Sequence, residues 1–434
     1  MNNLGLYCLT LSNFVAAYDY EDLYSRLFAR SPYLEEIKAQ YITGNSLRLL
    51  GSEAGSKLIS CDFYEISATA EDIEVLCRGC PNLESLSFCE GLAEGDADAA
   101  VLEIITHCPH IEKLDLNGWI DMTDLSLHRM STLVGLKELC LAYCPLFTSA
   151  SVRSLLQCLP NLEKLAFRLN EGNIDDILRC LSHYCPRLKD LYAGGEFVSQ
   201  DVVIALAQAC PRLVRLRILV ASFEPDDRVL IAIAACCPHL HTIDLPHCKP
   251  SAYTDLGLIA LSRGCPDLTL CLIDNDAATD ATILSFAEHC HKLTSIKISN
   301  NSRITYTSVC ALIKANPSIT IITLKHCTMV VEECLALPVQ YIPNLSFIRI
   351  EECEYLTESC LITLVTRGSL TGMCLTGCLC ATDSLIHSLV THCKKLETVS
   401  LYTCPNITDD SIVTLITLAP LLTRLDVREC SGAC

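Results

Sequence analysis

Several short groups of cysteine and histidine residues have the side-chain chemistry and the spacing that proteins use to hold zinc. Thiolate and imidazole groups a few residues apart along a chain are the usual ligands of structural zinc sites. Groups of this kind are Cys77 with Cys80, Cys236 with Cys237, His289–Cys290–His291, and Cys374 with Cys378 and Cys380. Each group, however, includes positions at which a pattern repeated along the whole chain places cysteine. We therefore interpret these thiols as packing groups and predict no metal site.

Other catalytic chemistry is equally sparse in the sequence. We find no glycine-rich phosphate loop, no nucleophile elbow and no pair of carboxylates in a convincing catalytic arrangement. The sequence thus predicts a protein that is not an enzyme, with no catalytic residues and no cofactor. Binding along a surface is the activity that we expect instead, and the repeated pattern shows which elements would form that surface.

The repeated pattern is Leu-x-x-Leu-x-Leu, or a close apolar variant of it, and it occurs seventeen times at a mean spacing of 26 residues. Its first positions are Leu6, Leu34, Leu58, Leu83, Ile111, Leu136, Leu162, Leu188, Leu213, Leu240, Leu268, Leu293, Ile319, Leu345, Leu370, Leu396 and Leu422. Self-similarity of this length with this core is typical of a leucine-rich repeat, in which each unit adds one strand and one helix to a stacked array. We predict an α/β solenoid of the horseshoe type, with a parallel sheet on the concave side, helices outside, and residues 1–434 in a single domain.

The unit that begins at Leu396 shows how the residues specify these elements. Val399 and Leu401 alternate with polar residues, which is the periodicity of a strand with its apolar side inward. Thr408 and Asp409 then supply an N-cap and a carboxylate beside the positive end of a helix dipole. The predicted helix buries one apolar face, made of Ile412, Leu415, Ile416 and Ala419.

The thirty cysteines occupy recurrent places in the repeat, which argues against a disulfide framework. Seven close the strand at the ninth repeat position: Cys144, Cys248, Cys327, Cys353, Cys378, Cys404 and Cys430. Eight end the helix, with two residues between each of them and the start of the next repeat: Cys80, Cys108, Cys185, Cys210, Cys237, Cys265, Cys290 and Cys393. Free cysteine packs as a small hydrophobic side chain. We therefore predict buried free thiols and a reducing compartment, the cytoplasm or the nucleus.

The composition favours a soluble chain that binds protein over one that binds membranes or nucleic acid. The first residues carry no basic segment of a signal peptide, and the longest apolar run, Val229 to Cys237, is far too short to cross a bilayer. With 51 Asp and Glu against 32 Lys and Arg, the formal net charge is −19, which opposes binding to a phosphate backbone. We expect no membrane partner and no nucleic-acid partner.

Outward strand residues, at the third, fifth and seventh repeat positions, would line the concave face. These positions carry eleven Lys or Arg and nine Asp or Glu, so the excess of acid lies elsewhere. Lys164, Arg168, Arg215 and Arg217 form the densest basic group, with Tyr192 between them. Because Arg and Tyr are common interface anchors, we predict a surface for an acidic protein segment; alternatively, the charges only keep the sheet soluble. Further predicted partner-binding residues are Lys297, Lys325, Arg349, Tyr402, Arg424 and Arg428.

The combined unit Cys-Pro-x-Leu-x-x-Leu-x-Leu-x-x-Cys-x-x-Ile-Thr-Asp resembles the cysteine-containing leucine-rich repeat of F-box/LRR proteins. Residues 237–248 and 393–409 match it well, and the resemblance covers nearly the whole chain. It implies that the repeats select a substrate for an SCF-type ubiquitin ligase, while a separate F-box binds the Skp1-type adaptor. Residues 1–50 contain no Leu-Pro-x-Glu start of an F-box. We therefore expect adaptor binding only through an F-box outside this chain.

The sequence as a whole predicts a protein-interaction receptor or scaffold whose concave face binds a protein partner, with ubiquitylation substrates as one class of partner. Two alternatives stay open. One is a structural subunit of a cytoskeletal or axonemal assembly, a role that some F-box/LRR relatives have. The other is an inhibitor that wraps around an enzyme, as ribonuclease inhibitor does, although the units of that family are longer than those found here.

Overall fold

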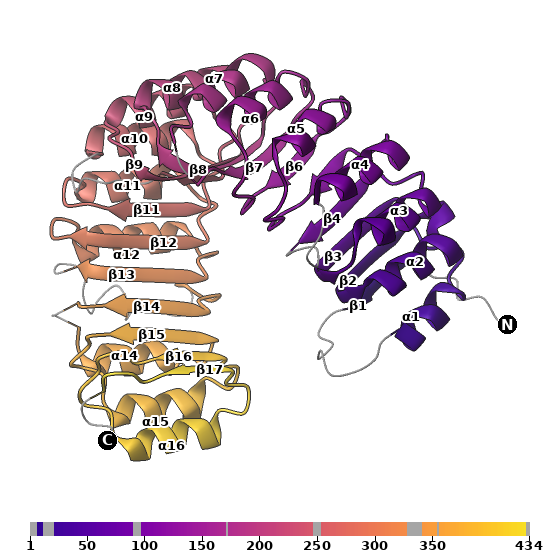
Figure 1. Cartoon of the computed structure of the whole chain (residues 1–434). Coiled ribbons are helices and arrows are strands. Elements are labelled where there is room, and N and C mark those ends of the chain that lie inside the picture. The colour runs from indigo at the N-terminus through magenta and orange to yellow at the C-terminus, as the bar shows by residue number, and fades with distance from the viewer. Residues whose placement is uncertain are drawn as a thin grey trace. The chain divides into compact units, whose positions relative to one another are not determined.

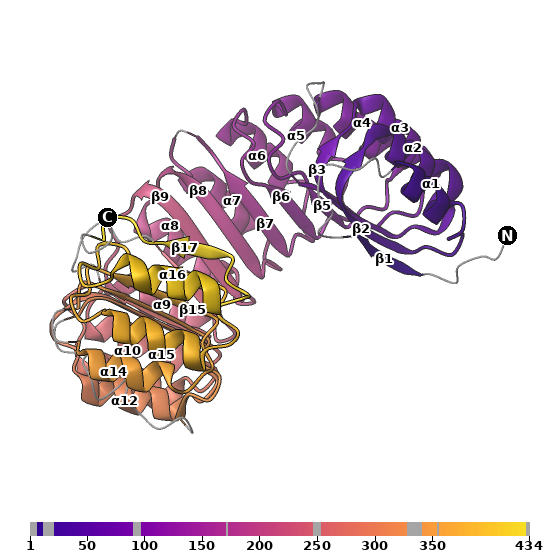
Figure 2. The ribbon, with the colours of Figure 1, turned by 90° about the horizontal axis from the view of Figure 1, so that it is seen from below.

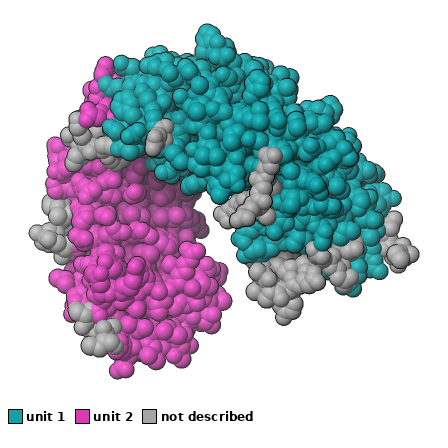
Figure 3. All heavy atoms as spheres, in the orientation of Figure 1, with its two compact units in different colours: residues 1–223, 244–246 teal, residues 224–243, 247–434 magenta. Residues whose placement is uncertain are grey.

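The computed structural model describes residues 7–11, 21–89, 97–170, 172–245, 253–327, 341–353 and 356–430. The chain divides into two compact units, which Figure 3 shows in different colours. Unit 1 comprises Met1–Phe223 and Asp244–Pro246, and unit 2 comprises Glu224–Ile243 and His247–Cys434. The two units are built from the same strand–helix repeat. The arrangement of residues 1–434 as one continuous domain stays a prediction.

Within the described residues, seventeen strands form two sheets in which neighbours follow the order of the chain. The first sheet contains β1 (Cys8–Leu11), β2 (Glu36–Thr43), β3 (Ser60–Ser67), β4 (Ser85–Cys89), β5 (Lys113–Asp115), β6 (Glu138–Leu141), β7 (Lys164–Arg168), β8 (Asp190–Phe197), β9 (Arg215–Ser222) and β10 (Thr242–Asp244). The second contains β11 (Leu270–Asp274), β12 (Ser295–Asn301), β13 (Ile321–Cys327), β14 (Phe347–Glu351), β15 (Gly372–Thr376), β16 (Thr398–Ser400) and β17 (Arg424–Asp426). Paired strands are parallel, with equivalent repeat positions side by side, as at Lys297 and Thr323.

A helix follows nearly every described strand and returns the chain to the start of the next one. These helices are α1 (Glu21–Phe28), α2 (Gly44–Glu53), α3 (Ala70–Gly79), α4 (Ala97–His107), α5 (Asp124–Met130), α6 (Ser149–Leu156), α7 (Asp175–Tyr184), α8 (Gln200–Ala209), α9 (Asp227–Cys236), α10 (Asp255–Gly264), α11 (Asp280–His289), α12 (Tyr306–Ala315), α14 (Glu358–Val365), α15 (Asp383–His392) and α16 (Asp409–Leu418). In each unit the helices stack side by side along one face of the sheet (Figures 1 and 2). We call the opposite face of each sheet its open face.

The core lies between the strands and the helices, where the repeated leucines place it. Along β9, Leu216 and Ile218 are buried, whereas Arg215 and Arg217 are exposed on the open face. This is the period of two that the sequence predicts for a strand with one apolar side. The predicted α/β repeat architecture with a parallel sheet and outer helices is therefore confirmed.

Where the ninth repeat position is cysteine, its thiol stabilises a turn at the end of the strand. Tyr143 has a left-handed backbone (φ 57°), and the thiol of Cys144 after it donates to the carbonyl of Leu116 in the preceding repeat at 3.3 Å. His326 (φ 47°) and Cys327 repeat the arrangement in unit 2. The thiols at this position thus both fill the core and hydrogen-bond neighbouring repeats together. Cys248 lies outside the described residues.

Cysteines at the helix ends are buried in the same way. The thiol of Cys265 donates to the carbonyl of Cys237, one repeat earlier, at 3.3 Å. Burial raises the pKa of Cys265 to about 12, so the thiol stays protonated and able to donate at neutral pH. The described cysteines, including those of the zinc-like groups, carry free thiols.

A carboxylate at the first residue of many helices joins neighbouring repeats. Asp255 of α10 accepts from the backbone amide and the hydroxyl of Thr279, the N-cap of α11, at 2.8 and 2.7 Å. The sequence predicts that such an acid only meets its own helix dipole, whereas the structure also places it against the next N-cap. Equivalent pairs are Asp98 with Thr123, Asp124 with Thr148, Asp175 with Ser199, Asp227 with Thr254, Asp280 with Thr305, and Asp383 with Thr408.

One part of the helix prediction in the unit of Leu396 is wrong. Leu415 and Ala419 of the predicted apolar face are buried, but Ile416 is 60% exposed. The described residues contain no helix after α16, so no neighbour packs against the side of the helix that carries Ile416. The spacing of apolar residues along a helix does not distinguish the face that packs on the sheet from the side that the helix of the next repeat would cover.

Candidate binding surfaces on the open sheet faces

Unit 1 carries a row of alternating charges across the third repeat position of its sheet. Parallel pairing sets Glu138, Lys164, Asp190 and Arg215 side by side on β6 to β9. The Lys164 ammonium lies 2.9 Å from Glu138, and the Arg215 guanidinium donates to Asp190 at 2.6 Å. Two of the predicted basic anchors are therefore already compensated by acids of the preceding strand.

The acid of this row is itself stabilised by the pairing. Burial opposes the ionisation of Glu138, but hydrogen bonds from Lys164 and Lys113 outweigh that effect and hold the pKa of Glu138 below its ordinary range. The Lys113 ammonium lies on its other side at 3.2 Å. Lys113, Glu138, Lys164, Asp190 and Arg215 alternate in sign along the row, with three positive charges against two negative ones, so the row as a whole offers a partner a net charge of only +1.

A second group in unit 1 combines arginine with tyrosine and is less well compensated. The guanidinium of Arg168 lies 6.0 Å from the ring centroid of Tyr143, within the range of a cation–π contact, and no described carboxylate forms an ion pair with Arg168. Arg217 is 3.6 Å from Asp244. Tyr192 of β8 is in register with Arg217 of β9, and its hydroxyl interacts electrostatically with that of Tyr143. We call Tyr143, Arg168, Tyr192 and Arg217 the Arg168 cluster.

Glycine makes room for the Arg168 side chain. Gly194 of β8 is in register with Arg168 of β7. A Cβ atom at Gly194 would lie 2.7 Å from Cγ of Arg168, so the aliphatic stem of the arginine crosses the glycine on the neighbouring strand. The absence of a side chain at Gly194 thus sets the direction in which Arg168 extends.

Unit 1 also exposes aromatic and apolar side chains in the turns that follow its strands. Tyr143 is 58% exposed, and the loops after β5 and β6 expose Ile120 and Leu146 by 63% and 52%. Sequence reasoning missed Tyr143, because it considered outward strand positions and this residue occupies the turn after β6. Burial raises the pKa of Tyr192, and its contact with Tyr143 raises it further, so the Tyr192 hydroxyl stays protonated and able to donate.

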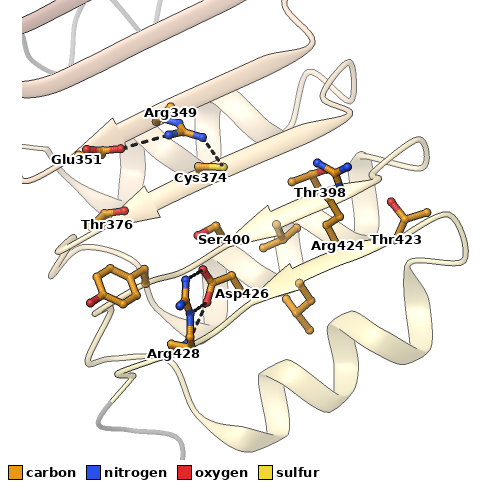
Figure 4. A pocket seen from close by; sticks show the side chains of 13 residues that line it. Arg349, Glu351, Cys374, Thr376, Thr398, Ser400, Thr423, Arg424, Asp426 and Arg428 are labelled. Carbon is orange, nitrogen blue, oxygen red and sulfur yellow. Dashed lines mark hydrogen bonds and ion pairs between the residues drawn. The ribbon is translucent and has the colours of Figure 1, made fainter. Parts of the chain in front are cut away.

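Unit 2 contains a hollow of about 680 Å³ on its open face, over strands β14 to β17 (Figure 4). Its lining includes four of the predicted residues, Arg349, Tyr402, Arg424 and Arg428. Tyr402 and Arg428 follow the ends of β16 and β17, so they lie beyond the strands on which the sequence placed them. We call this feature the C-terminal hollow.

Carboxylates compensate part of the positive charge around the C-terminal hollow. The Arg428 guanidinium donates to both oxygens of Asp426, at 2.9 and 2.8 Å, and this contact lowers the pKa of Asp426. Arg428 also lies 5.6 Å from the ring centroid of Tyr402. Glu351 is shared between Lys325 at 2.9 Å and Arg349 at 3.5 Å.

Two predicted cations have no such compensation. The ammonium of Lys297 on β12 and the guanidinium of Arg424 on β17 form no ion pair or hydrogen bond with any residue in the described ranges. Both side chains are exposed on the open face of unit 2. The structure therefore divides the eleven predicted residues between two surfaces, five in unit 1 and six in unit 2.

One further group has ligand types that a metal ion accepts, and sequence reasoning missed it. Glu74 of α3 and Glu103 and His107 of α4 bring their ligand atoms within 4.8 Å of one another. The guanidinium of Arg78 lies in this group, 2.6 Å from Glu74 and 3.4 Å from His107. Arg78 thus already pairs with Glu74, and His107 lies 3.3 Å from Glu103, so the group is explained as a cluster of polar contacts between the two helices.

The chain was compared with known families, sequences and solved structures. No family model matches the chain. The chain is similar to Rad7, from the crystal structure of the yeast Rad7 and Elc1 complex, with a TM-score of 0.50 and 16% identity over 93% of this chain and 86% of that chain. An internalin (inlF) of Listeria monocytogenes gives a TM-score of 0.43 and 14% identity over 75% and 81% of the two chains. The likeness to Rad7 supports the fold class, a leucine-rich-repeat array, and nothing finer.

One sequence match concerns a shorter segment. Over 141 residues the chain is 31% identical to the "Antagonist of mitotic exit network protein 1" of Eremothecium gossypii. The match covers 31% of this chain and 34% of that protein, so the chain spans about a third of the length of this curated relative. Within the described ranges, no helix has both the length and the apolar character that crossing a membrane requires.

Proposed function

We propose that this chain is a protein-interaction receptor or scaffold without catalytic activity, and that it binds a partner segment on the open face of unit 1. The observation that carries the proposal is the Arg168 cluster, in which an arginine without a described carboxylate partner stands beside two tyrosines. Arginine and tyrosine supply much of the binding energy of protein interfaces. The partner segment carries acidic side chains for Arg168 and apolar side chains for the exposed Leu146 and Ile120.

The regulatory role proposed here follows the family resemblance of the repeats. We place the chain in the cytoplasm or the nucleus as the substrate-recognition part of an SCF-type ubiquitin ligase, with the adaptor held by an F-box outside this chain. Two likenesses support the proposal without deciding it: Rad7 was crystallised with the protein Elc1, and the curated relative is named as an antagonist of the mitotic exit network. The cysteine-containing repeat is the feature that connects the chain to the F-box/LRR class.

A photo-crosslinking experiment tests the binding surface. Benzoylphenylalanine replaces Tyr192 on the open face in one version of the full chain, expressed in cells of its source organism. A matched version carries it at Leu102 of α4, which is 38% exposed on the helical side. We expect a discrete crosslinked protein from position 192 that accumulates when the proteasome is inhibited. Crosslinking from position 102 alone would place the partner on the helices and refute the proposal.

This experiment tests the binding surface and the ligase role separately. A partner that crosslinks at position 192 but whose level does not change on proteasome inhibition supports the binding surface and contradicts the ligase role. Replacing Arg168 with Gln in the crosslinking version provides the internal control, because it removes the uncompensated charge and is expected to reduce the yield.

A further inference from the structure

The C-terminal hollow arises from the sizes of the residues on neighbouring strands. Its floor, on β15 and β16, consists of the short side chains of Cys374, Thr376, Thr398 and Ser400. Longer side chains stand on both sides, Arg349 and Glu351 on β14 and Arg424, Asp426 and Arg428 on or just after β17, as Figure 4 shows. At equivalent repeat positions, the side chains are thus long on β14, short on β15 and β16, and mostly long again on or just after β17. The hollow lies over the two strands that carry the short side chains.

Outside the lining of the hollow, a phenylalanine of β14 covers the start of β15. Phe347 of β14 is in register with Gly372 of β15. A Cβ atom at Gly372 would lie 2.4 Å from the Phe347 ring, so the ring lies over the glycine. The Phe347 ring therefore lies over β15, and any side chain larger than that of glycine at position 372 would exclude the ring from this place.

The acids around the hollow have close cationic partners, whereas two of its arginines have weak partners or none. Asp426 is held by two hydrogen bonds from Arg428, and Glu351 lies closest to Lys325, at 2.9 Å. Arg349 has a 3.5 Å contact with Glu351 and donates a long hydrogen bond, 4.0 Å, to the thiol of Cys374, whereas the guanidinium of Arg424 has no partner among the described residues. The floor adds the hydroxyls of Thr376, Thr398 and Ser400, and none of these donates a hydrogen bond to another described residue. The hollow therefore offers two cations and several donors to a ligand.

The register of the sheet fixes the distance between the Cα atoms of the two arginines. Arg349 is in register with Cys374, Cys374 with Ser400, and Ser400 with Asp426, which follows Arg424 by two residues. Three strand steps and two residues along a strand separate the Cα atoms of Arg349 and Arg424 by about 16 Å. An extended peptide covers that distance in four to six residues.

From these observations we infer that the C-terminal hollow is a second binding site, for an extended peptide segment whose two acidic side chains are four to six residues apart. One carboxylate pairs with Arg424 and the other with Arg349, and the residues between them lie over the floor of Cys374, Thr398 and Ser400. The inference rests on the proposed protein-binding function in its general form, but it uses no residue of the Arg168 cluster.

A peptide library provides the test. It contains soluble peptides in which zero to eight random residues separate two glutamates, and it is selected against the full chain. We expect enrichment of peptides with three to five intervening residues. Arg424→Gln should weaken the best peptide about tenfold, because it removes one of the two charge-assisted contacts. Ser400→Phe, which fills the floor without changing a charge, should weaken it to a similar extent.

Lys297→Gln is the matched control for this site. Lys297 is also an exposed cation without a described partner on the open face of unit 2, but it lies on β12, outside the hollow. We expect its replacement to leave the peptide affinity within about twofold. An equal loss with Lys297→Gln, no preference for spacing, or an unchanged affinity in Ser400→Phe would each overturn the inference. Arg168→Gln separates the two sites, since it should reduce crosslinking at position 192 and leave peptide binding in the hollow intact.

Discussion

Asp255, the first residue of α10, accepts hydrogen bonds from both the amide and the hydroxyl of Thr279, the N-cap of α11, at 2.8 and 2.7 Å. The hydroxyl of Thr282 adds a third, at 2.6 Å. Burial opposes ionisation of this carboxyl, but the hydrogen bonds outweigh it and hold the pKa of Asp255 below its ordinary range. The carboxylate is thus a link between two repeats that is strongest while it is charged.

Replacing Asp255 with Asn should lower the stability of unit 2. The amide keeps one acceptor but presents an N–H₂ group where further donors point, so the loss at pH 7 should be about 1–3 kcal/mol. Because the native pKa is depressed, the contribution of Asp255 is fully present above about pH 4 and is lost as the pH falls through its native pKa. Urea unfolding at several pH values measures both effects.

Asp409 gives this experiment its control. It occupies the first position of α16, as Asp255 does in α10, but no described N-cap follows it. Asp409→Asn should therefore lose only the interaction with its own helix dipole, about 0.3–1 kcal/mol. If both variants lost the same amount at pH 7, the link between repeats would contribute nothing measurable.

The two kinds of basic residue in unit 1 should differ in their effect on partner binding. Arg168→Gln removes a charge with no described ion-pair partner and should weaken binding about threefold to tenfold. Lys164→Gln removes a charge that Glu138 already compensates at 2.9 Å, and should change affinity by less than about twofold. Titration of the crosslinked partner with each variant, at low and physiological salt, makes the comparison. Equal losses would favour a diffuse basic surface over the Arg168 cluster.

The buried thiols should react slowly in the folded protein. Burial raises the pKa of Cys210 and Cys265 to about 12, so few of these thiols are deprotonated at neutral pH. The exposed Cys8 should be alkylated first under native conditions. In urea without reductant the remaining thiols should all become reactive, as counted by intact mass. Thiols that stay blocked in urea would reveal disulfides and contradict the proposed reducing compartment.

This chain should not bind a Skp1-type adaptor by itself. Residues 36–53 form β2 and α2, and β2 pairs in register with β3, so this segment already belongs to the repeat array. A pull-down with purified adaptor should therefore recover no stoichiometric complex. The same chain fused behind an F-box should bind, which verifies the adaptor preparation.

The repeat fold and the positions of the buried thiols could be predicted because a 26-residue period reports on packing directly. Leu34 and Cys265 are buried as the pattern requires. The compensation of Lys164 could also have been found, since Glu138 holds the same position one repeat earlier. The role of Tyr143 could not, because its exposure depends on the turn after β6. The hollow depends on a run of short side chains in adjacent repeats, which only the sheet register brings together.

The residue before each described cysteine of the ninth repeat position has a left-handed backbone. This limits which insertions and deletions such a chain can tolerate. In unit 2, Thr403 (φ 51°) adopts a costly backbone, and the thiol of Cys404 after it donates to the carbonyl of Leu375, one repeat earlier. Each repeat therefore depends on the one before it for its turn. If one whole repeat within a unit were deleted, the cysteine thiol of the following repeat would again meet the equivalent backbone carbonyl of the repeat now before it. If half a repeat were deleted, the thiol and the carbonyl would no longer be in register. Arrays of this kind should gain and lose material in complete repeats, and alleles that differ by other lengths should be rare.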